Sequence, residues 1–295
     1  MNNYTNEKMP PKGSVCAIGN FDGVHPGHRR LFDICRKIAE RQGGDVLALT
    51  FDGLDKGNGQ LTTRADREMY LRVAGVDHVI SVDFETVRNM TPREFVQEYL
   101  VGRIDPSAVV CGEDFRFGCG ASGNAELLCK LMNEYNIPVH IADTVMLDDK
   151  PVSTSRVKSA LSEGDAEAAA MILGRRYSFA YPVEIGKRLG RTIGAPTINQ
   201  RFPAGMFVPK YGVYATVTEI GDREYPSVTN IGVRPTVDDG DSVTAETYII
   251  GYEGDLYGET IRVSLRKYLR DEIKFDSVEA LAEQIRKDAD ESINL

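Results

Sequence analysis

The sequence of 295 residues has no tryptophan, four histidines and no apolar run long enough to span a membrane. The first twelve residues are polar and lack the apolar core of a signal peptide. The five cysteines are odd in number and contain no Cys-x-x-Cys pair, so they outline neither a disulfide framework nor a zinc site. We therefore expect reduced cysteines that bind no metal, and a cytoplasmic location.

A basic surface is also missing, because 44 acidic residues outnumber 35 basic residues and give a net charge of −9. This charge argues against non-specific nucleic-acid binding, which needs positive surface. An anionic nucleotide can still bind where backbone amides or a metal ion outweigh the average charge. The chain has no Walker A motif, so any ATP chemistry cannot depend on a P-loop.

The length suits two domains that each bury a core. In the first half, short and almost continuous apolar runs alternate with amphipathic stretches, which predicts a doubly wound parallel sheet with helices on both faces. The expected strands are 14–18, 45–51, 78–82, 108–111 and 138–142, and the expected helices are 28–42, 64–74, 91–102, 123–135, 155–162 and 165–173.

The pattern changes after Leu173 to short β-branched and aromatic segments separated by glycine-rich turns. This change predicts an α/β protein whose second part is a small antiparallel β-barrel followed by a C-terminal helix. The expected segments are 182–186, 211–220, 227–233, 243–252 and 259–268, with the helix at 277–292. We therefore expect domains at 1–176 and 177–295, with the boundary near residues 174–181.

The most informative stretch is Gly19-Asn-Phe21-Asp22-Gly23-Val-His25-Pro-Gly-His28, which lies between the first expected strand and the first expected helix. Backbone N–H groups at such a turn can hold a phosphate. Two imidazoles three residues apart at a helix start can point at a common ligand. Zinc is one use of such a pair, but further ligands at metal spacing are not evident. Stabilisation of charge on a phosphoryl group fits better.

This stretch resembles the His-x-Gly-His signature of the nucleotidyltransferase family, whose members transfer a nucleoside monophosphate and release pyrophosphate. Residues 152–158 occupy the place of the family's second signature, Ile-Ser-Ser-Thr-x-x-Arg. The resemblance assigns phosphate binding to Ser153, Ser155 and Lys158, and Lys158 replaces an arginine, which keeps the charge but loses the bidentate fork. An ordinary helix cap is the alternative interpretation of the serines.

A second glycine pattern, Gly118-Cys-Gly120-Ala-Ser-Gly123 with Asp143 further on, matches the dinucleotide-binding fingerprint. That fingerprint belongs directly after the first strand of its fold, whereas here it follows the fourth expected strand. Residues 114–118 instead resemble a segment of bacterial FAD synthetases, and an ordinary loop or lid is the alternative.

The second half carries its own signal at residues 186–199, where glycines and basic residues precede a Pro-Thr-x-Asn sequence. Glycines allow close backbone approach to phosphates. We expect ligand binding at Gly190, Arg191, Gly194 and Pro196. Two further side chains, Thr197 and Asn199, lie two apart on an extended segment and therefore share a side, which suits Mg²⁺. A glycine-rich turn with a buried threonine is the alternative.

Together with residues 230–236, Glu246, 254–258 and 269–275, this segment resembles riboflavin kinases. The resemblance makes Glu246 the general base that accepts a proton from the ribityl hydroxyl, and it places Arg270 among the ligand-binding residues. Tyr248 and Ala195 depart from the residues common in that family, but neither change removes the base or the metal ligands.

The two halves together resemble the bifunctional bacterial riboflavin kinase/FAD synthetase family over nearly the whole chain. The resemblance implies ATP, riboflavin and FMN as substrates and Mg²⁺ as cofactor, with no nucleic-acid or membrane partner; an oligomer is compatible with it. Such synthetases usually have Phe-Asp-Pro-His-Pro after the second strand, whereas this chain reads Phe51-Asp52-Gly53-Leu-Asp. We therefore expect an active kinase and a slower adenylyl transfer. A cytidylyltransferase and a non-catalytic flavin-binding regulator are the alternatives.

Overall fold

The structure is a computed structural model that describes residues 11–53, 57, 59–186, 195–236 and 240–295. Contacts between Cα atoms group the chain into two compact units. One unit contains Met1–Gly57 and Thr62–Ser153, and the other contains Asn58–Leu61 and Thr154–Leu295. The domain division expected after residue 176 stays a prediction. Among the described residues, no helix is both long and apolar enough to cross a membrane.

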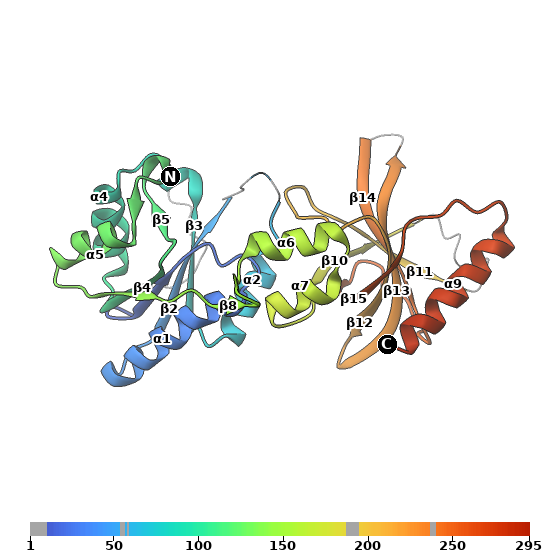
Figure 1. The fold of residues 1–295 in the computed structure, drawn as a ribbon, viewed down its shortest axis with the longest axis horizontal. Helices are drawn as coiled ribbons and strands as arrows, with labels where there is room; N and C mark the ends of the chain where they lie inside the picture. The colour runs from blue at the N-terminus through green and yellow to red at the C-terminus, as the bar shows by residue number, and fades with distance from the viewer. Residues whose placement is uncertain (1–10, 54–56, 58, 187–194, 237–239) are drawn as a thin grey trace. The chain divides into compact units, whose positions relative to one another are not determined.

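The first unit is built on a five-stranded parallel sheet in the order β3-β2-β1-β4-β7. Figure 1 labels three of its strands, β2, β3 and β4. Its strands are β1 (Val15–Ile18), β2 (Val46–Asp52), β3 (His78–Asp83), β4 (Ala108–Gly112) and β7 (Val139–Ala142). Its helices are α1 (Pro26–Gln42), α2 (Arg64–Val73), α3 (Phe84–Val87), α4 (Pro92–Phe95), η1 (Val96–Ile104) and α5 (Ala125–Asn133), with a short 3-10 turn η2 (Cys119–Ala121). The predicted doubly wound fold is therefore confirmed.

The two faces of this sheet bury separate apolar cores, because successive side chains of a strand point to opposite sides. Val15 and Ala17 of β1 pack with side chains from α1 and α2. Cys16 and Ile18 pack with side chains from η1 and α5 on the other face. Helices on both faces explain why the strands are apolar throughout.

The single helix expected at 91–102 is instead a short α-helix followed by the π-helix η1. The start was predicted correctly, since Thr91 and Glu94 form a capping box. Gly102 accounts for the wider turn, because a Cβ at this position would lie 2.8 Å from the carbonyl oxygen of Gln97, five residues earlier. A side chain larger than hydrogen would therefore collide with the π-helical backbone.

The glycines of the dinucleotide-like pattern lie at a hairpin of β5 (Arg116–Phe117) and β6 (Gly123–Asn124), not at a strand-to-helix turn. Gly118 has a φ of +74°, and a Cβ there would lie 2.7 Å from the ring of Pro92. This geometry explains the glycine by local packing and agrees with setting the dinucleotide interpretation aside. A second short hairpin joins β8 (Met146–Leu147) and β9 (Lys150–Pro151).

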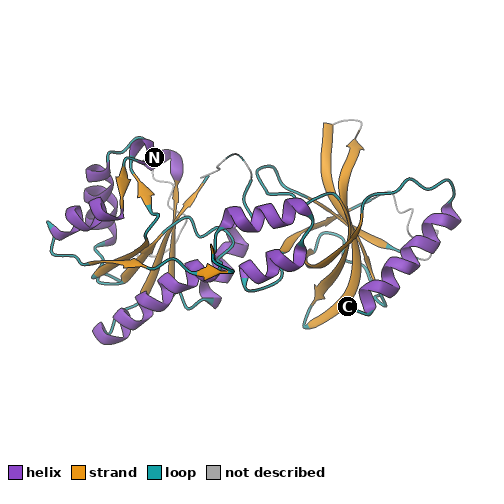
Figure 2. Ribbon diagram, in the orientation of Figure 1, coloured by secondary structure: helices purple, strands orange, loops and turns teal. Residues whose placement is uncertain are grey.

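The second unit contains a closed barrel in the strand order β10-β11-β14-β13-β12-β15. Figure 2 draws the strands of this barrel in orange. The strands are β10 (Ser178–Glu184), β11 (Thr197–Arg201), β12 (Gly212–Ile220), β13 (Arg223–Thr236), β14 (Gly240–Ile249) and β15 (Thr260–Arg270). The helices are α6 (Thr154–Glu163), α7 (Ala166–Leu173) and α9 (Val278–Ile293). The predicted antiparallel barrel and C-terminal helix are confirmed, with β13 longer than expected.

The barrel interior contains a chain of hydroxyl groups between its strands. Thr216, Ser227, Thr229 and Thr247 are fully buried, and their hydroxyls bond to one another at 2.8–2.9 Å. Mutual pairing removes the cost of burying these polar groups. Outside the barrel, α9 packs against β12 and β13, where Ala289 joins an apolar cluster. Helix α9 therefore covers part of the outer face of β12 and β13.

A buried arginine fixes the end of β2, next to the segment that departs from Phe-Asp-Pro-His-Pro. The side chain of Arg67 is 1% exposed and its guanidinium is paired with the carboxylate of Asp52. Arg64 reaches the same carboxylate at 3.3 Å. Two further guanidinium nitrogens of Arg67 are buried with no hydrogen-bond partner among the described residues, so Asp52 is the anion that compensates this charge.

We expect Arg67→Ala to lower the free energy of unfolding by about 3 kcal/mol, because it removes a buried ion-pair partner and leaves a cavity. Urea unfolding followed by circular dichroism measures this loss. Arg67→Met keeps the apolar volume and should recover about half of it. Equal stability of wild type and Arg67→Ala would show that the pair contributes nothing to the fold.

Candidate active sites

The turn after β1 has an unusual backbone. Phe21 and Val24 have positive φ angles of 51° and 42°, and both side chains are fully buried. Such angles are costly for residues with a Cβ and persist where the surroundings enforce them. The turn between β1 and α1 is therefore held in one shape, as expected of a preformed phosphate site.

The two histidines of the turn lie against each other. The imidazole rings of His25 and His28 are stacked, with centroids 3.6 Å apart and planes at 16°. His25 is the N-cap of α1, and its Nδ1 accepts the backbone N–H of His28 at 3.3 Å. Because Nδ1 accepts, a neutral His25 carries its proton on Nε2. The ring edge of Phe21 packs on His28 with centroids 5.3 Å apart.

Gly27 makes this arrangement possible. A Cβ at Gly27 would lie 3.0 Å from Nδ1 and Cε1 of His25, and 3.6 Å from the carbonyl oxygen of Val152. The middle glycine of His-x-Gly-His therefore leaves room for the first imidazole ring. The backbone just before Ser153 also approaches this point, so the turn and the start of the second signature meet within the first unit.

Asp22 has a supporting position in the turn. It is 2% exposed, and its Oδ1 accepts from both the backbone N–H of Thr62 at 3.1 Å and the hydroxyl of Thr62 at 3.0 Å. The N–H of Gly23 in turn donates to that hydroxyl at 3.3 Å. Asp22 and Gly23, expected to contact ligand, thus tie the turn to the segment before α2. Gly19 lies under the ring of Phe21, where a Cβ would be 2.9 Å from the ring.

The second signature begins α6, as expected from its serines. Ser153 is the residue before the helix, and Ser155 lies in its first turn. The ammonium group of Lys158 donates to the backbone carbonyl of Gly59 and lies 5.9 Å from the ring centroid of Phe207. The helix N-terminus adds positive potential for a phosphate. The structure thus supplies partners for Lys158 that the sequence did not indicate.

In the barrel, the predicted base and one predicted metal ligand share a cross-strand row, and the other metal ligand lies on the same face in a neighbouring row. Asn199 of β11 pairs with Glu246 of β14, and Glu246 pairs with Asn230 of β13. Directly opposed residues in antiparallel strands place their side chains on the same face. Thr197 lies two residues before Asn199 and therefore shares that face. The expected extended segment is thus strand β11.

Close packing fixes the position of Asn199. This residue is 8% exposed, and a Cβ at Gly186 would lie 2.4 Å from its Nδ2. Only glycine at position 186 leaves room for the amide. The strand face that carries Glu246 therefore presents an amide, a hydroxyl and a carboxylate, all of which offer oxygen atoms to a hard cation.

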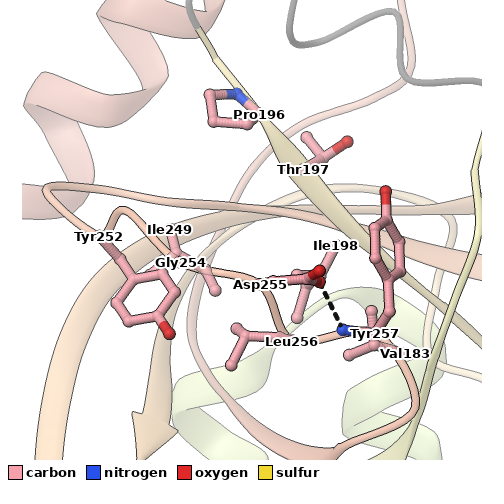
Figure 3. A pocket seen from close by; sticks show the side chains of 10 residues that line it. All are labelled: Val183, Pro196, Thr197, Ile198, Ile249, Tyr252, Gly254, Asp255, Leu256 and Tyr257. Atoms are coloured by element: carbon pink, nitrogen blue, oxygen red, sulfur yellow. Dashed lines mark hydrogen bonds between the residues drawn. The ribbon is translucent and has the colours of Figure 1, made fainter.

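Beside Thr197 the barrel has a small cavity of about 50 Å³, shown in Figure 3. Its lining residues are Val183, Pro196, Thr197, Ile198, Ile249, Tyr252, Gly254, Asp255, Leu256 and Tyr257. The carboxylate of Asp255 accepts the backbone N–H of Tyr257 at 3.1 Å, which orders the loop over the cavity. Pro196, expected at a ligand site, thus lies at the cavity together with Thr197.

Arg270 forms an ion pair that the sequence did not indicate. Its guanidinium donates to both carboxylate oxygens of Asp288, with a shortest distance of 2.8 Å. Asp288 is 5% exposed and belongs to α9. The arginine therefore anchors the C-terminal helix to the end of β15. The expected binding residues Gly190, Arg191 and Gly194 lie outside the described residues.

Within the described part of the chain, no group of three histidine, cysteine or acidic side chains is placed to hold a metal ion. The five cysteines are free. Burial raises the pKa of the Cys16 thiol to about 12 and that of the Cys111 thiol to about 12. These two thiols therefore stay protonated and contribute to the core.

Comparisons with known proteins match both halves of the chain. A family model for FAD synthetase matches residues 7–156, and one for riboflavin kinase matches residues 173–295. The bifunctional riboflavin kinase/FMN adenylyltransferase of Escherichia coli strain K12 is 35% identical over 95% of this chain and 92% of its own length. The Bacillus subtilis protein of that name is 31% identical over 95% and 92% of the two chains.

A solved structure also matches nearly the whole chain. A crystal structure titled as a macrolide-efflux protein from Streptococcus pneumoniae matches with a TM-score of 0.85 and 30% identity, over 97% of this chain and 95% of that chain. Matches over both halves define the class as a two-domain transferase of phosphorus-containing groups, a nucleotidyltransferase joined to a kinase. The chain belongs to the bifunctional riboflavin kinase/FMN adenylyltransferase family.

Proposed function

We propose that the barrel phosphorylates riboflavin to FMN with ATP, and that the α/β half with the second signature joins FMN to AMP to form FAD. The family membership supports both activities. The observation that carries the kinase assignment is the cross-strand row that sets Glu246 between two amides. The stacked His25–His28 pair at the start of α1 carries the adenylyltransferase assignment.

In the kinase step, Glu246 accepts the proton of the terminal ribityl hydroxyl. The oxygen of that hydroxyl forms a bond to the γ-phosphorus, and the bond from this phosphorus to the ADP oxygen breaks. Thr197 and Asn199 fit a divalent ion through their oxygens, and Mg²⁺ there would neutralise charge on the phosphates.

In the adenylyl transfer, an FMN phosphate oxygen attacks the α-phosphorus of ATP and pyrophosphate leaves. The nucleophile is already an anion, so the protein needs no covalent intermediate. His25 and His28 stabilise the charge that develops on the α-phosphate, together with the N–H groups at the start of α1. Ser153, Ser155 and Lys158 bind the triphosphate, and Lys158 compensates the leaving pyrophosphate.

A timed product assay tests the proposal. Purified protein is incubated with riboflavin, ATP and Mg²⁺, and the flavins are separated by chromatography. We expect FMN to form first and FAD to follow, with FMN accumulating because the turn after Asp52 lacks the Pro-His-Pro sequence. If no FMN formed, the kinase assignment would be wrong. FMN without any FAD would confine the error to the first half.

A further inference from the structure

Strand β13 brings a third polar side chain next to Glu246, and none of the roles above uses it. Asn230 lies directly opposite Glu246 in the β13–β14 ladder, on the side away from Asn199. Its side chain therefore shares the face on which the phosphorylation chemistry is placed. The segment that contains Asn230 matches the riboflavin kinase pattern, but a pattern alone gives no role to this amide.

The amide of Asn230 has one satisfied end and one unsatisfied end. Its Nδ2 donates to Oε1 of Glu272 at 3.0 Å. Its Oδ1 is buried and accepts no hydrogen bond from any described residue. A carboxylate only accepts hydrogen bonds, so Glu272 selects the orientation in which the amide nitrogen faces it and the oxygen faces away.

Glu272 follows β15 and is exposed, yet its carboxylate lies close to strand β13. A Cβ at Gly232, two residues after Asn230, would lie 2.3 Å from Oε1 of Glu272. Gly232 therefore leaves the room in which the carboxylate reaches Asn230. Any other residue at this position would displace the carboxylate and release the amide.

We propose that Oδ1 of Asn230 accepts a hydrogen bond from a hydroxyl of the ribityl chain, and that Glu272 is a positioning residue that holds the amide for this contact. The proposal deepens the kinase function and rests on it. A buried acceptor without a donor is costly, and a polyol supplies the missing donor. The reacting hydroxyl must reach Glu246, and Asn230 lies directly opposite Glu246, so a neighbouring hydroxyl of the same chain is within its reach.

The first test compares two flavins that differ in the polyol. Riboflavin carries the ribityl chain, whereas lumiflavin has a methyl group in its place. We expect Asn230→Ala in the full-length protein to weaken riboflavin binding roughly tenfold, as measured by quenching of flavin fluorescence, and to leave lumiflavin binding unchanged. Equal weakening of both flavins, or of neither, would overturn the proposal.

The second test asks whether Glu272 acts through Asn230. We expect Glu272→Ala to raise the KM for riboflavin roughly threefold. Glu272→Gln should stay close to wild type, because the glutamine oxygen still accepts from Nδ2. The double variant Asn230→Ala/Glu272→Ala should equal Asn230→Ala alone. Additive losses in the double variant would show that Glu272 does not work through this amide.

A matched control is Glu291→Ala, which removes another exposed acid of the same unit, paired with Lys267 at 3.2 Å. It should leave the KM for riboflavin unchanged. Circular dichroism and urea unfolding of every preparation report whether a variant is folded. Glu246→Gln separates this proposal from the proposed function: if it abolishes phosphorylation while Asn230→Ala binds riboflavin normally, only the role of Asn230 is wrong.

Discussion

Glu246→Gln is expected to lower kcat for riboflavin phosphorylation by roughly 10²- to 10⁴-fold, because the amide cannot accept the hydroxyl proton. The change keeps the shape of the side chain and its place between Asn199 and Asn230 in the ladder. Riboflavin binding should therefore persist with at most a small change in Kd. Steady-state kinetics and fluorescence titration measure the two effects separately.

The control for this variant is present in the same chain. FMN adenylyltransferase activity with FMN supplied should stay at the wild-type rate, since the stacked histidines belong to the other compact unit. Glu246→Asp keeps a carboxylate but moves it back by one methylene, so it should retain part of the rate. Phosphorylation by Glu246→Gln at the wild-type rate would remove Glu246 as the base.

The fold class was predictable from the sequence, because a run of apolar residues indicates a buried segment. The strands of the first unit are apolar on both sides because helices cover both faces, and this predicts a parallel sheet without knowledge of contacts. The π-helix was not predictable, because its wider turn depends on the approach of Gly102 to the carbonyl of Gln97. A single glycine within an amphipathic pattern does not reveal this geometry.

The sequence predicts which side chains belong to the candidate sites, but it does not predict how they are arranged. Periodicity puts Thr197 and Asn199 on one side of a strand, as observed. The pairing of Asn199 with Glu246 depends on how the barrel closes. Neither segment alone indicates the register in which the two strands pair. The role of Asn230 depends in turn on Glu272, 42 positions later, and only the folded chain shows that contact.

The contacts of charged side chains were the least predictable feature of the structure. Arg67 lies in α2 beside Asp66, and both are buried, yet the sequence offers no sign that Arg67 pairs with Asp52. Arg270 was assigned to ligand binding through the family pattern, whereas the structure pairs it with Asp288. The partner of a long charged side chain depends on which residues the fold brings near it. The sequence therefore predicts its charge but not its contacts.

His28→Ala is expected to lower kcat/KM for FMN adenylylation by roughly 10²- to 10³-fold, because it removes one donor for the charge on the α-phosphate. The backbone of the turn should survive, since it is held by the buried side chains of Phe21 and Val24 and by the Asp22–Thr62 hydrogen bonds. A coupled assay of pyrophosphate release measures the loss, circular dichroism controls for folding, and riboflavin phosphorylation should stay unchanged. Wild-type adenylylation by His28→Ala would contradict the role of this imidazole.

His25 has two roles that one pair of variants separates. His25→Ala removes both the imidazole and the N-cap of α1, so it should lower stability by about 1 kcal/mol as well as the adenylylation rate. His25→Asn restores an oxygen that can accept the N–H of His28, and it should recover the stability. It should not recover the rate, because the asparagine side chain is too short to present a donor where Nε2 stood. Recovery of both by His25→Asn would mean that His25 acts as a cap alone, and that His28 carries the phosphate chemistry of this turn.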